Sequence, residues 1–403
     1  MTKLMMRRTK LVKIAGAKVD TQLSQVGREV GPTAKMFSIG AKIDANNGLA
    51  PGFDIVRVVL AVAVVAWHSV PIASRDTAWF DDARVAWVPG YAILAVFFGL
   101  SGFLITGSAQ RLSLGNFLLN RGLRIFPALI VETALSAIIL GTIFTTLSLS
   151  EYFSHHQTWE YFTSLFGYIK YYLPGVFNDN PIPQVNLSLW TVPYELLCYF
   201  IMSVFIIFGA LKRPWLVVLA AAIFAFVSIA LWIIGIQQES SLFIERGAYA
   251  VFVGRASRLL ICFLLGIAAY LFRYKIPYSK TLFLGCCVYL AGLSLLSPPD
   301  LESYPLLNVV IGPVAVYICV FLGASEIPTA ALFRKGDYSY GIYLYGAPIQ
   351  QAMRALVHSE SALINFLVSM PAILIFAAFS WHLIEKPVLH MRRHFSFVAR
   401  VRN

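Results

Sequence analysis

The sequence predicts an all-α polytopic membrane protein of about ten transmembrane helices, with both termini in the cytoplasm. Of its 403 residues, 58% are hydrophobic and only 13% are charged, whereas soluble domains carry about 25% charged residues. Apolar stretches of about 20 residues recur along the chain, and each is long enough to cross a hydrocarbon core of about 30 Å. Lys and Arg gather in alternate connecting segments, as the positive-inside rule expects.

The apolar stretches define the expected spans and, with them, three regions of the chain. The spans are 52–70, 90–109, 125–149, 187–210, 215–236, 256–272, 281–297, 305–323, 338–357 and 363–384. Residues 1–50 are basic and lack an apolar run long enough for a signal peptide. We expect them to form a cytoplasmic tail, with short amphipathic helices on anionic membrane lipid as an option. Residues 51–386 form the membrane domain, and residues 387–403 form a second basic tail.

The net charge of +12 is explained by this topology. With the N-terminus in the cytoplasm, most Lys and Arg fall in inner segments. The outer segments hold only Arg75, Arg84, Lys170, Arg246, Arg255 and Arg258. The positive-inside bias accounts for the basic excess, so no nucleic-acid partner is predicted.

Neither the cysteines nor the paired histidines predict a metal site. The cysteines fall within predicted spans without CxxC spacing, which argues against a disulfide framework or a zinc site. They are Cys198, Cys262, Cys286, Cys287 and Cys319. The adjacent His155 and His156 lie in the aromatic outer segment 150–186, and two neighbours are weak evidence for a metal. The aromatic rings of this segment suit the membrane interface or, alternatively, a vestibule where a sugar stacks.

Arg57 and His68 lie in the first span, eleven residues apart. Eleven residues make three helical turns, so both side chains share one face and are separated by about 16 Å along the helix axis. Ionisable groups inside a membrane usually face a polar cavity and mark a functional site. A snorkelling arginine paired with Asp54 is the alternative for Arg57, and a satisfied core residue is the alternative for His68. The functional interpretation is an anion-binding arginine and a general base.

Three further segments supply candidate residues. Arg121 and Arg124 are three residues apart at the start of the third span, so their guanidinium groups can converge on one phosphate. Ser101 lies in a stripe of small residues with Gly99, Gly102 and Gly107, for which close helix packing is the simpler explanation. Glu195, in the fourth span, is expected to pair either with His68, fixing its tautomer, or with another polar group.

Near the C-terminus, the ninth span contains a polar wall, which suits either a cavity or hydrogen bonds within the bundle. It consists of Tyr338, Tyr340, Tyr343, Tyr345, Gln350, Gln351 and Arg354. At the end of the last span, Glu385 and Lys386 are interpreted as residues that end the helix.

Taken in order, these segments resemble the acyltransferase family 3 integral membrane proteins. The resemblance rests on FDIVRVVLAVAVVAWH, FFGLSGFLIT, RGLRIFPAL, SLWTVPYEL, DYSYGIYLYGAPIQ and HLIEKP, and it covers about residues 50–390. It implies a bacterial inner-membrane enzyme that O-acylates carbohydrate. The family pattern falls on Arg57, His68, Ser101, Arg121, Arg124 and Glu195.

The resemblance implies acyl-CoA as cosubstrate, commonly acetyl-CoA, and no permanently bound cofactor. The acceptor would be a carbohydrate or lipid-linked saccharide, such as exopolysaccharide or lipopolysaccharide. In the mechanism that it suggests, Arg57, Arg121, Arg124 and Ser101 hold the donor, His68 is the base and Glu195 orients it. Transfer through an acylated His68 or Ser101 is the alternative route. A transporter of lipid-linked saccharide that does no covalent chemistry is the alternative function.

Overall fold

A computed structural model describes residues 37–46, 48, 50–77, 86–296, 305–327 and 336–395 of the chain. Within these ranges the regular structure is helical. The only β-type pairings there are two isolated bridges, Ser38 with Pro277 and Thr145 with Val176. The predicted all-α class is therefore confirmed.

The chain divides into two compact units. The smaller combines Met1–Leu49 with Phe272–Ser279 and contains helix α3, Ile39–Ala45. This helix begins after Ser38, whose hydroxyl accepts a first-turn backbone N–H at 3.2 Å, as helix-capping serines do. The predicted N-terminal tail falls mostly on residues 1–36, which lie outside the described residues.

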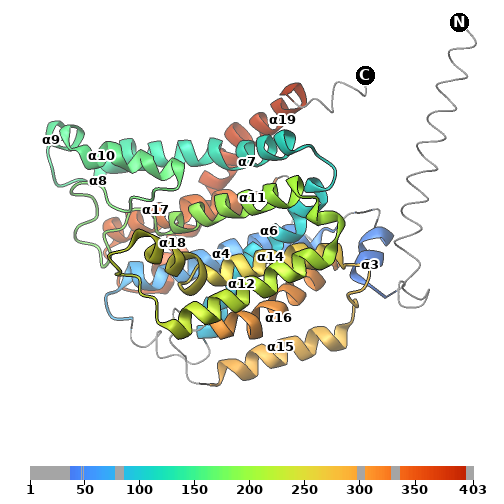
Figure 1. Ribbon diagram of the computed structural model, residues 1–403. Helices are drawn as coiled ribbons and strands as arrows, with labels where there is room; N and C mark the ends of the chain where they lie inside the picture. The colour runs from blue at the N-terminus through green and yellow to red at the C-terminus, as the bar shows by residue number, and fades with distance from the viewer. Residues whose placement is uncertain are drawn as a thin grey trace, which may run out of the picture. The chain divides into compact units, whose positions relative to one another are not determined.

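The larger unit, Ala50–Leu271 with Lys280–Asn403, is a bundle of long helices. The long helices are α4 (Gly52–Ala73), α6 (Trp87–Ala109), α7 (Leu114–Ala134), α11 (Val192–Ile207), α12 (Pro214–Ile234), α14 (Ser257–Leu271), α15 (Lys280–Ser294), α16 (Pro305–Ala324), α17 (Ser339–Val357) and α18 (Ala362–Phe379). Figure 1 shows α7 at one side of this bundle, α15 at the other, and α6 and α14 between them.

Shorter elements connect and extend these helices. The α-helical ones are α8 (Gly141–Phe144), α9 (Leu149–Ser154), α10 (His156–Glu160), α13 (Phe243–Ala248) and α19 (Lys386–Phe395). The 3₁₀ segments are η2 (Tyr161–Phe166), η3 (Leu187–Thr191) and η4 (Ala210–Lys212). The π-helical segments are η1 (Leu135–Leu140), η5 (Tyr249–Val253) and η7 (Ser380–Glu385).

All ten predicted spans coincide with helices, but the count of ten spans is not confirmed. Among the described residues, seven helices are long and apolar enough to cross a membrane. An eighth is added if the pair Phe243–Val253 and Ser257–Leu271, bent by 54°, forms one span. Helix α15 has only 15 residues, which reach about 22 Å at 1.5 Å per residue. Helix α17 is long enough but carries many polar side chains.

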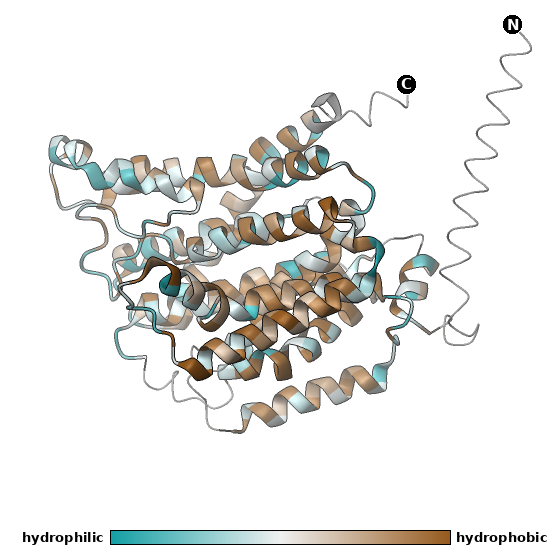
Figure 2. Cartoon of the chain, in the orientation of Figure 1, coloured by the Kyte–Doolittle hydropathy of each residue, from teal (hydrophilic) through white to brown (hydrophobic). Residues whose placement is uncertain are grey.

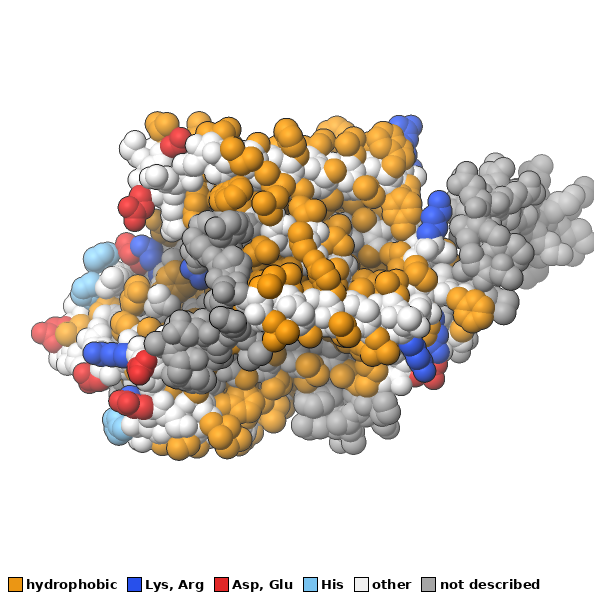
Figure 3. All heavy atoms as spheres, turned by 90° about the horizontal axis from the view of Figure 1, so that it is seen from below, with side chains coloured by type: hydrophobic (Ala, Val, Ile, Leu, Met, Phe, Trp, Pro, Cys, Tyr) orange, Lys and Arg blue, Asp and Glu red, His pale blue; other side chains and the backbone are white. Residues whose placement is uncertain are grey.

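The outside of the bundle is apolar. Phe226 on α12 is 72% exposed and Ile375 on α18 is 68% exposed. Hydrophobic residues predominate along the long helices in Figure 2. In Figure 3 they cover the middle of the visible face, and charged side chains gather toward its two ends. Soluble proteins rarely expose apolar areas of this extent, so this surface fits contact with lipid.

The small residues of α6 bring its backbone against that of α14. A Cβ atom on Gly102 would collide with the carbonyl group of Phe263, and one on Gly266 would collide with the carbonyl group of Gly99. Glycine is therefore required on both helices for this approach. The predicted helix packing at the small-residue stripe is confirmed for Gly99 and Gly102.

Candidate functional site

Two cavities open within the larger unit, and together they contain every predicted site residue. The first, here called the arginine cavity, has a volume of about 340 Å³. Its polar lining residues are Arg57, Ser101, Ser108, Arg121, Arg124, Thr191, Glu195, Tyr199, Ser339, Tyr340 and Tyr343. The second, here called the histidine cavity, has a volume of about 300 Å³. Its aromatic and polar lining residues are Trp67, His68, Tyr171, Gln184, Trp190, Arg255 and Arg258.

Helix α4 extends along both cavities. Arg57 lines the arginine cavity and His68 lines the histidine cavity, three turns further along the same helix. Of the residues that line either cavity, Leu94 on α6 is the one common to both. The predicted pair thus faces polar cavities at two depths of the bundle, as ionisable groups in a membrane are expected to do.

A shared carboxylate joins two of the three predicted arginines. Asp337 Oδ2 accepts hydrogen bonds from Arg57 Nη1 at 2.7 Å and from Arg124 Nη2 at 2.8 Å. Arg57 also pairs with Asp54, and Arg124 also pairs with Glu385. Positive charge from α4 and α7 is therefore largely balanced by carboxylates before any ligand binds.

Asp337 is held as a carboxylate by its surroundings. Burial acts to raise its pKa, but the guanidinium groups of Arg124 and Arg57 and the hydrogen bonds from Ser339 outweigh burial and lower the pKa to about 2. The Ser339 hydroxyl donates to Asp337 Oδ1 at 2.6 Å. Opposite charges and hydrogen bonds to the ionised form are the usual causes of such a shift.

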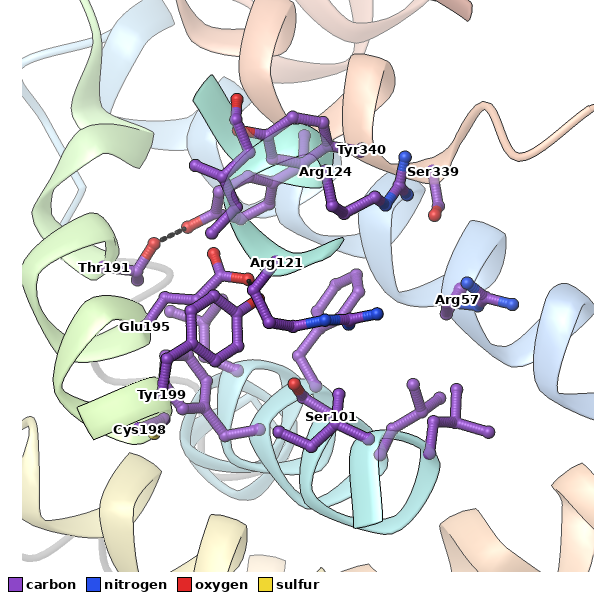
Figure 4. Close-up of a pocket in the computed structure, with 18 of the residues that line it drawn as sticks. Arg57, Ser101, Arg121, Arg124, Thr191, Glu195, Cys198, Tyr199, Ser339 and Tyr340 are labelled. Carbon is purple, nitrogen blue, oxygen red and sulfur yellow. Dashed lines mark hydrogen bonds between the residues drawn. The ribbon is translucent and has the colours of Figure 1, made fainter. Parts of the chain in front are cut away.

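Arg121 differs from the other two arginines. It forms no ion pair with any described residue, and its buried Nε, like that of Arg57, has no hydrogen-bond partner there. In Figure 4 its side chain extends into the cavity between Tyr199 and Arg57. A buried donor without a partner is costly, by about 1–3 kcal/mol. Arg121 is therefore the guanidinium of this cavity that is best placed to accept an anionic ligand.

Glu195 is found with the arginines rather than with His68. Its Oε1 accepts a hydrogen bond from the Tyr199 hydroxyl at 2.6 Å, and it lines the arginine cavity. Of the two expected alternatives for Glu195, the structure shows the second, in which it pairs with a polar group other than His68. The five residues of η3 precede α11, and a 3₁₀ segment rises about 2.0 Å per residue rather than 1.5 Å. Over five residues this adds only about 2.5 Å, so the longer rise moves Glu195 slightly deeper than a count of α-helical residues indicates.

His68 lies among aromatic and cationic side chains. The guanidinium carbon of Arg255 lies 5.0 Å from the Trp190 ring centroid, within the range of a cation–π contact. Trp67 packs so closely on Gly90 that a Cβ atom there would collide with its ring. Burial is the one influence recorded for His68, which has no hydrogen bond to any residue that the structure describes. Its ring nitrogens are therefore not committed to a neighbour in that part of the chain.

Two acidic residues of the arginine network were missed or misjudged from the sequence. Asp337 lies two residues before the tyrosine-rich α17, and its place as the first residue of the DYSYG segment was the only signal. Glu385 was interpreted as part of a helix end, but its side chain is only 1% exposed. It belongs to η7, where the Ser380 hydroxyl donates to Glu385 Oε1 at 2.9 Å. A π-helix places residues five apart on one face, which turns Glu385 inward.

A third acidic residue, Glu132 on α7, was also missed. It is 1% exposed, and its Oε1 accepts from the Asn186 side chain at 2.8 Å. The same Asn186 amide donates to the Leu344 carbonyl at 3.0 Å. Pro348 has no N–H with which to bond that carbonyl within α17, so Asn186 takes its place. Glu132 thereby fixes the residue at which η3 begins.

The polar wall of α17 has both of the predicted roles. Tyr340 and Tyr343 line the arginine cavity, and the Tyr343 hydroxyl bonds the Thr191 hydroxyl at 2.7 Å. Gln350 instead joins helices, because its amide donates to the carbonyl oxygen of Val65 at 2.9 Å. Some polar residues of α17 therefore line the cavity, and others form hydrogen bonds between helices of the bundle.

Comparisons with known proteins match most of the chain. Residues 51–382 match the acyltransferase 3 family, described as an acyltransferase domain. A protein of Shigella phage Sf6 named O-acetyl transferase is 29% identical over 343 residues, which are 84% of this chain and 95% of that protein. Nodulation protein 10 of Rhizobium leguminosarum bv. viciae is 27% identical over 387 residues, which are 90% of this chain and 99% of that protein. No solved structure matches.

Proposed function

The chain belongs to the acyltransferase 3 family, and from this premise we propose that it transfers an acetyl group from acetyl-CoA, across the membrane, to a hydroxyl group of a saccharide. Membership makes it an acyltransferase. The name of the phage relative supports acetyl as the group and oxygen as the acceptor atom. The positive-inside bias supports the arginine cavity as the cytoplasmic side.

One observation carries the proposal, namely that α4 supplies an arginine to one cavity and a histidine to the other. The arginine cavity would take the donor. Its volume of about 340 Å³ is near the lower end of the range for ligand pockets, about 300–1,000 Å³. This size suits the acyl-pantetheine arm better than a whole coenzyme, so the phosphates would remain at the arginines.

The acceptor would occupy the histidine cavity. The rings of Trp67 and Trp190 and the amide of Gln184 line it. Flat rings beside a hydrogen-bonding amide suit a sugar, which offers apolar C–H faces and hydroxyl groups. A lipid-linked saccharide would present the same chemistry while its lipid remained in the membrane.

In the proposed reaction His68 acts as general base. Its neutral imidazole takes the proton of the acceptor hydroxyl while the oxygen attacks the thioester carbon. A C–O bond forms and the C–S bond breaks, and the leaving thiolate takes the proton back from the imidazolium. Ser101 lines the other cavity, where the lining residues include no histidine to activate it. This separation favours direct transfer over an acyl-serine route.

The experiment uses sealed, oriented vesicles that contain the full-length protein and a supply of acceptor saccharide. Radiolabelled acetyl-CoA is supplied on the arginine side, and label in the extracted saccharide is measured for the wild type and His68→Ala. Loss of a general base lowers a rate by about 10²–10⁴-fold. His156→Ala is the matched control, because that side chain is 76% exposed. Full transfer by His68→Ala would contradict the mechanism. Saccharide movement without any need for acetyl-CoA would instead favour a transporter.

A further inference from the structure

The two cavities have one lining residue in common, and its side chain is apolar. On α6, Gly90 lines the histidine cavity, Ser101 lines the arginine cavity, and Leu94 lies between them and lines both. Residues 90, 94, 97 and 101 recur at helical spacing, so they form one stripe along the helix. Leu94 therefore has the arginine cavity on one side of its side chain and the histidine cavity on the other.

A second wall of the cavities, formed by η3 and Tyr343 of α17, is fixed by hydrogen bonds. Segment η3 also extends along both cavities, with Trp190 in the histidine cavity and Thr191 in the arginine cavity. The Thr191 hydroxyl bonds the Tyr343 hydroxyl at 2.7 Å, and Tyr343 also donates to the Ser188 carbonyl at 3.1 Å. The Phe97 ring packs against the Tyr343 ring with centroids 6.0 Å apart.

Leu94 differs from this wall because its side chain is apolar and only half-buried. No hydrogen bond holds it, so its size and rotamer, rather than a bonded network, set the space at this level. A change of side-chain volume at position 94 is therefore expected to change the opening between the cavities with little effect on the hydrogen bonds of the second wall.

From this arrangement we propose that Leu94 separates the donor from the acceptor and sets the length of the acyl group that the enzyme transfers. The inference rests on the proposed acyl transfer. A thioester that arrives from the arginine cavity and an acceptor hydroxyl beside His68 can meet only near Leu94. The carbon chain of the acyl group must then lie against this side chain. A leucine leaves room for a short group such as acetyl and excludes longer ones.

The substitutions follow from side-chain size. Leu94→Ala removes three carbon atoms from the partition, more than the two carbons by which butyryl exceeds acetyl. Leu94→Phe fills the opening. One methylene in an apolar pocket alters discrimination by about tenfold or more. We therefore expect Leu94→Ala to raise the ratio of kcat/KM for butyryl-CoA to that for acetyl-CoA by at least about tenfold. We expect Leu94→Phe to lower acetyl transfer while acetyl-CoA still binds.

The experiment measures transfer from acetyl-, propionyl- and butyryl-CoA by the full-length protein in vesicles. Because each variant is judged by a ratio of substrates, a reduced fraction of folded enzyme cancels. Val96→Ala is the matched control, since Val96 lies on α6 but packs against the cluster that includes Trp87 and Ile311, away from both cavities. If Leu94→Ala lacks activity, the smaller change Leu94→Val takes its place and should shift the ratio in the same direction.

The outcomes separate the inference from the proposed function. A raised butyryl preference in Leu94→Ala and a wild-type ratio in Val96→Ala would support the partition. Acetyl transfer by the wild type with an unchanged ratio in Leu94→Ala would overturn the inference and leave the proposed function intact. Equal shifts in both variants would also overturn it, because they would indicate a general loosening of α6. No acetyl transfer by the wild type, with acceptor present, would overturn both.

Discussion

Replacing Asp337 tests whether the arginine network stabilises the bundle. In Asp337→Asn the side chain keeps its shape and can still accept from Ser339, but it loses the charge shared by Arg57 and Arg124. Two guanidinium groups on different helices then face each other without their common carboxylate. Breaking a buried ion pair by removing one partner typically destabilises a protein by about 3–5 kcal/mol.

The lowered pKa of Asp337 gives an independent magnitude. Its fall from 3.8 to about 2 corresponds to about 2 kcal/mol of preferential stabilisation of the ionised form, at about 1.4 kcal/mol per pKa unit. The side chain is 22% exposed, so solvent weakens the interaction only in part. We therefore expect Asp337→Asn to lower the free energy of unfolding by about 2–3 kcal/mol.

The assay is reversible unfolding of the purified protein in detergent at pH 7, with Asp54→Asn as the matched control. Asp54 pairs with the same Arg57, but its side chain is 62% exposed, and exposed pairs contribute about 0–1 kcal/mol. Equal unfolding free energies for Asp337→Asn and the wild type would refute the reasoning, as would an equally large loss in Asp54→Asn.

The same group predicts a pH dependence with a definite sign. Because the folded pKa lies below the ordinary value of 3.8, the stabilisation by Asp337 is fully present above about pH 4. It is lost as the pH falls from 3.8 toward 2. The difference in stability between the wild type and Asp337→Asn should therefore be constant from pH 5 to 8 and shrink below about pH 4. A difference that stayed constant down to pH 2 would contradict this account.

Three further changes test the arginine cavity, the buried carboxyl group of Glu132 and the contact between α6 and α14. Arg121→Ala should raise the KM for acetyl-CoA by roughly tenfold to a hundredfold, since a hydrogen bond to a charged group contributes about 1.5–3 kcal/mol. The difference in KM between this variant and the wild type should shrink at high salt, and an unchanged, salt-independent KM would contradict the prediction. Glu132→Gln should preserve thermal stability, because its side-chain oxygen can still accept from Asn186. Glu132→Ala should cost about 1–3 kcal/mol, because it leaves one N–H of the Asn186 amide without an acceptor, and equal stabilities of the two variants would contradict this. Gly102→Ala should destabilise the protein by about 1–3 kcal/mol through overpacking against α14. Gly115→Ala should not, because its Cβ would meet nothing within 4 Å, and equal unfolding midpoints for the two variants would contradict the prediction.

The sequence predicted the helices well because their main determinant is local. A membrane requires about 20 apolar residues in a row, and such runs are visible without knowledge of the fold. The number of spans is harder to predict, because tertiary contacts decide whether a helix with polar side chains can lie inside the bundle. Helix α17 can carry Gln350 in its interior only because Val65 and Ser69 of α4 accept its hydrogen bonds. The hydropathy of a sequence window does not reveal such partners, because they lie on another helix.

Apart from the local pair of Arg57 with Asp54, the candidate site was predicted as residue types and not as pairs. Helical spacing correctly placed Arg57 and His68 along one helix that extends past two cavities. The carboxylate partner of Arg124 could not be found in this way, because Asp337 lies 213 residues further along the chain. Only the folded bundle brings α7 beside the start of α17. The π-helical turn that buries Glu385 likewise has no sequence pattern that distinguishes it from an ordinary helix end.

The distribution of carboxylates gives the three arginines different roles. A phosphate that approached Arg57 or Arg124 would compete with Asp337, which already forms an ion pair with each of these arginines. The binding free energy of the phosphate at these arginines would therefore be the difference between the energies of two similar ion pairs. At Arg121 a phosphate would meet a guanidinium that forms no ion pair with the described residues, so it would displace no carboxylate there. Under the proposed function, the RGLR segment therefore combines Arg124, which pairs with carboxylates of the bundle, with Arg121, on which we expect the affinity for acetyl-CoA mainly to depend.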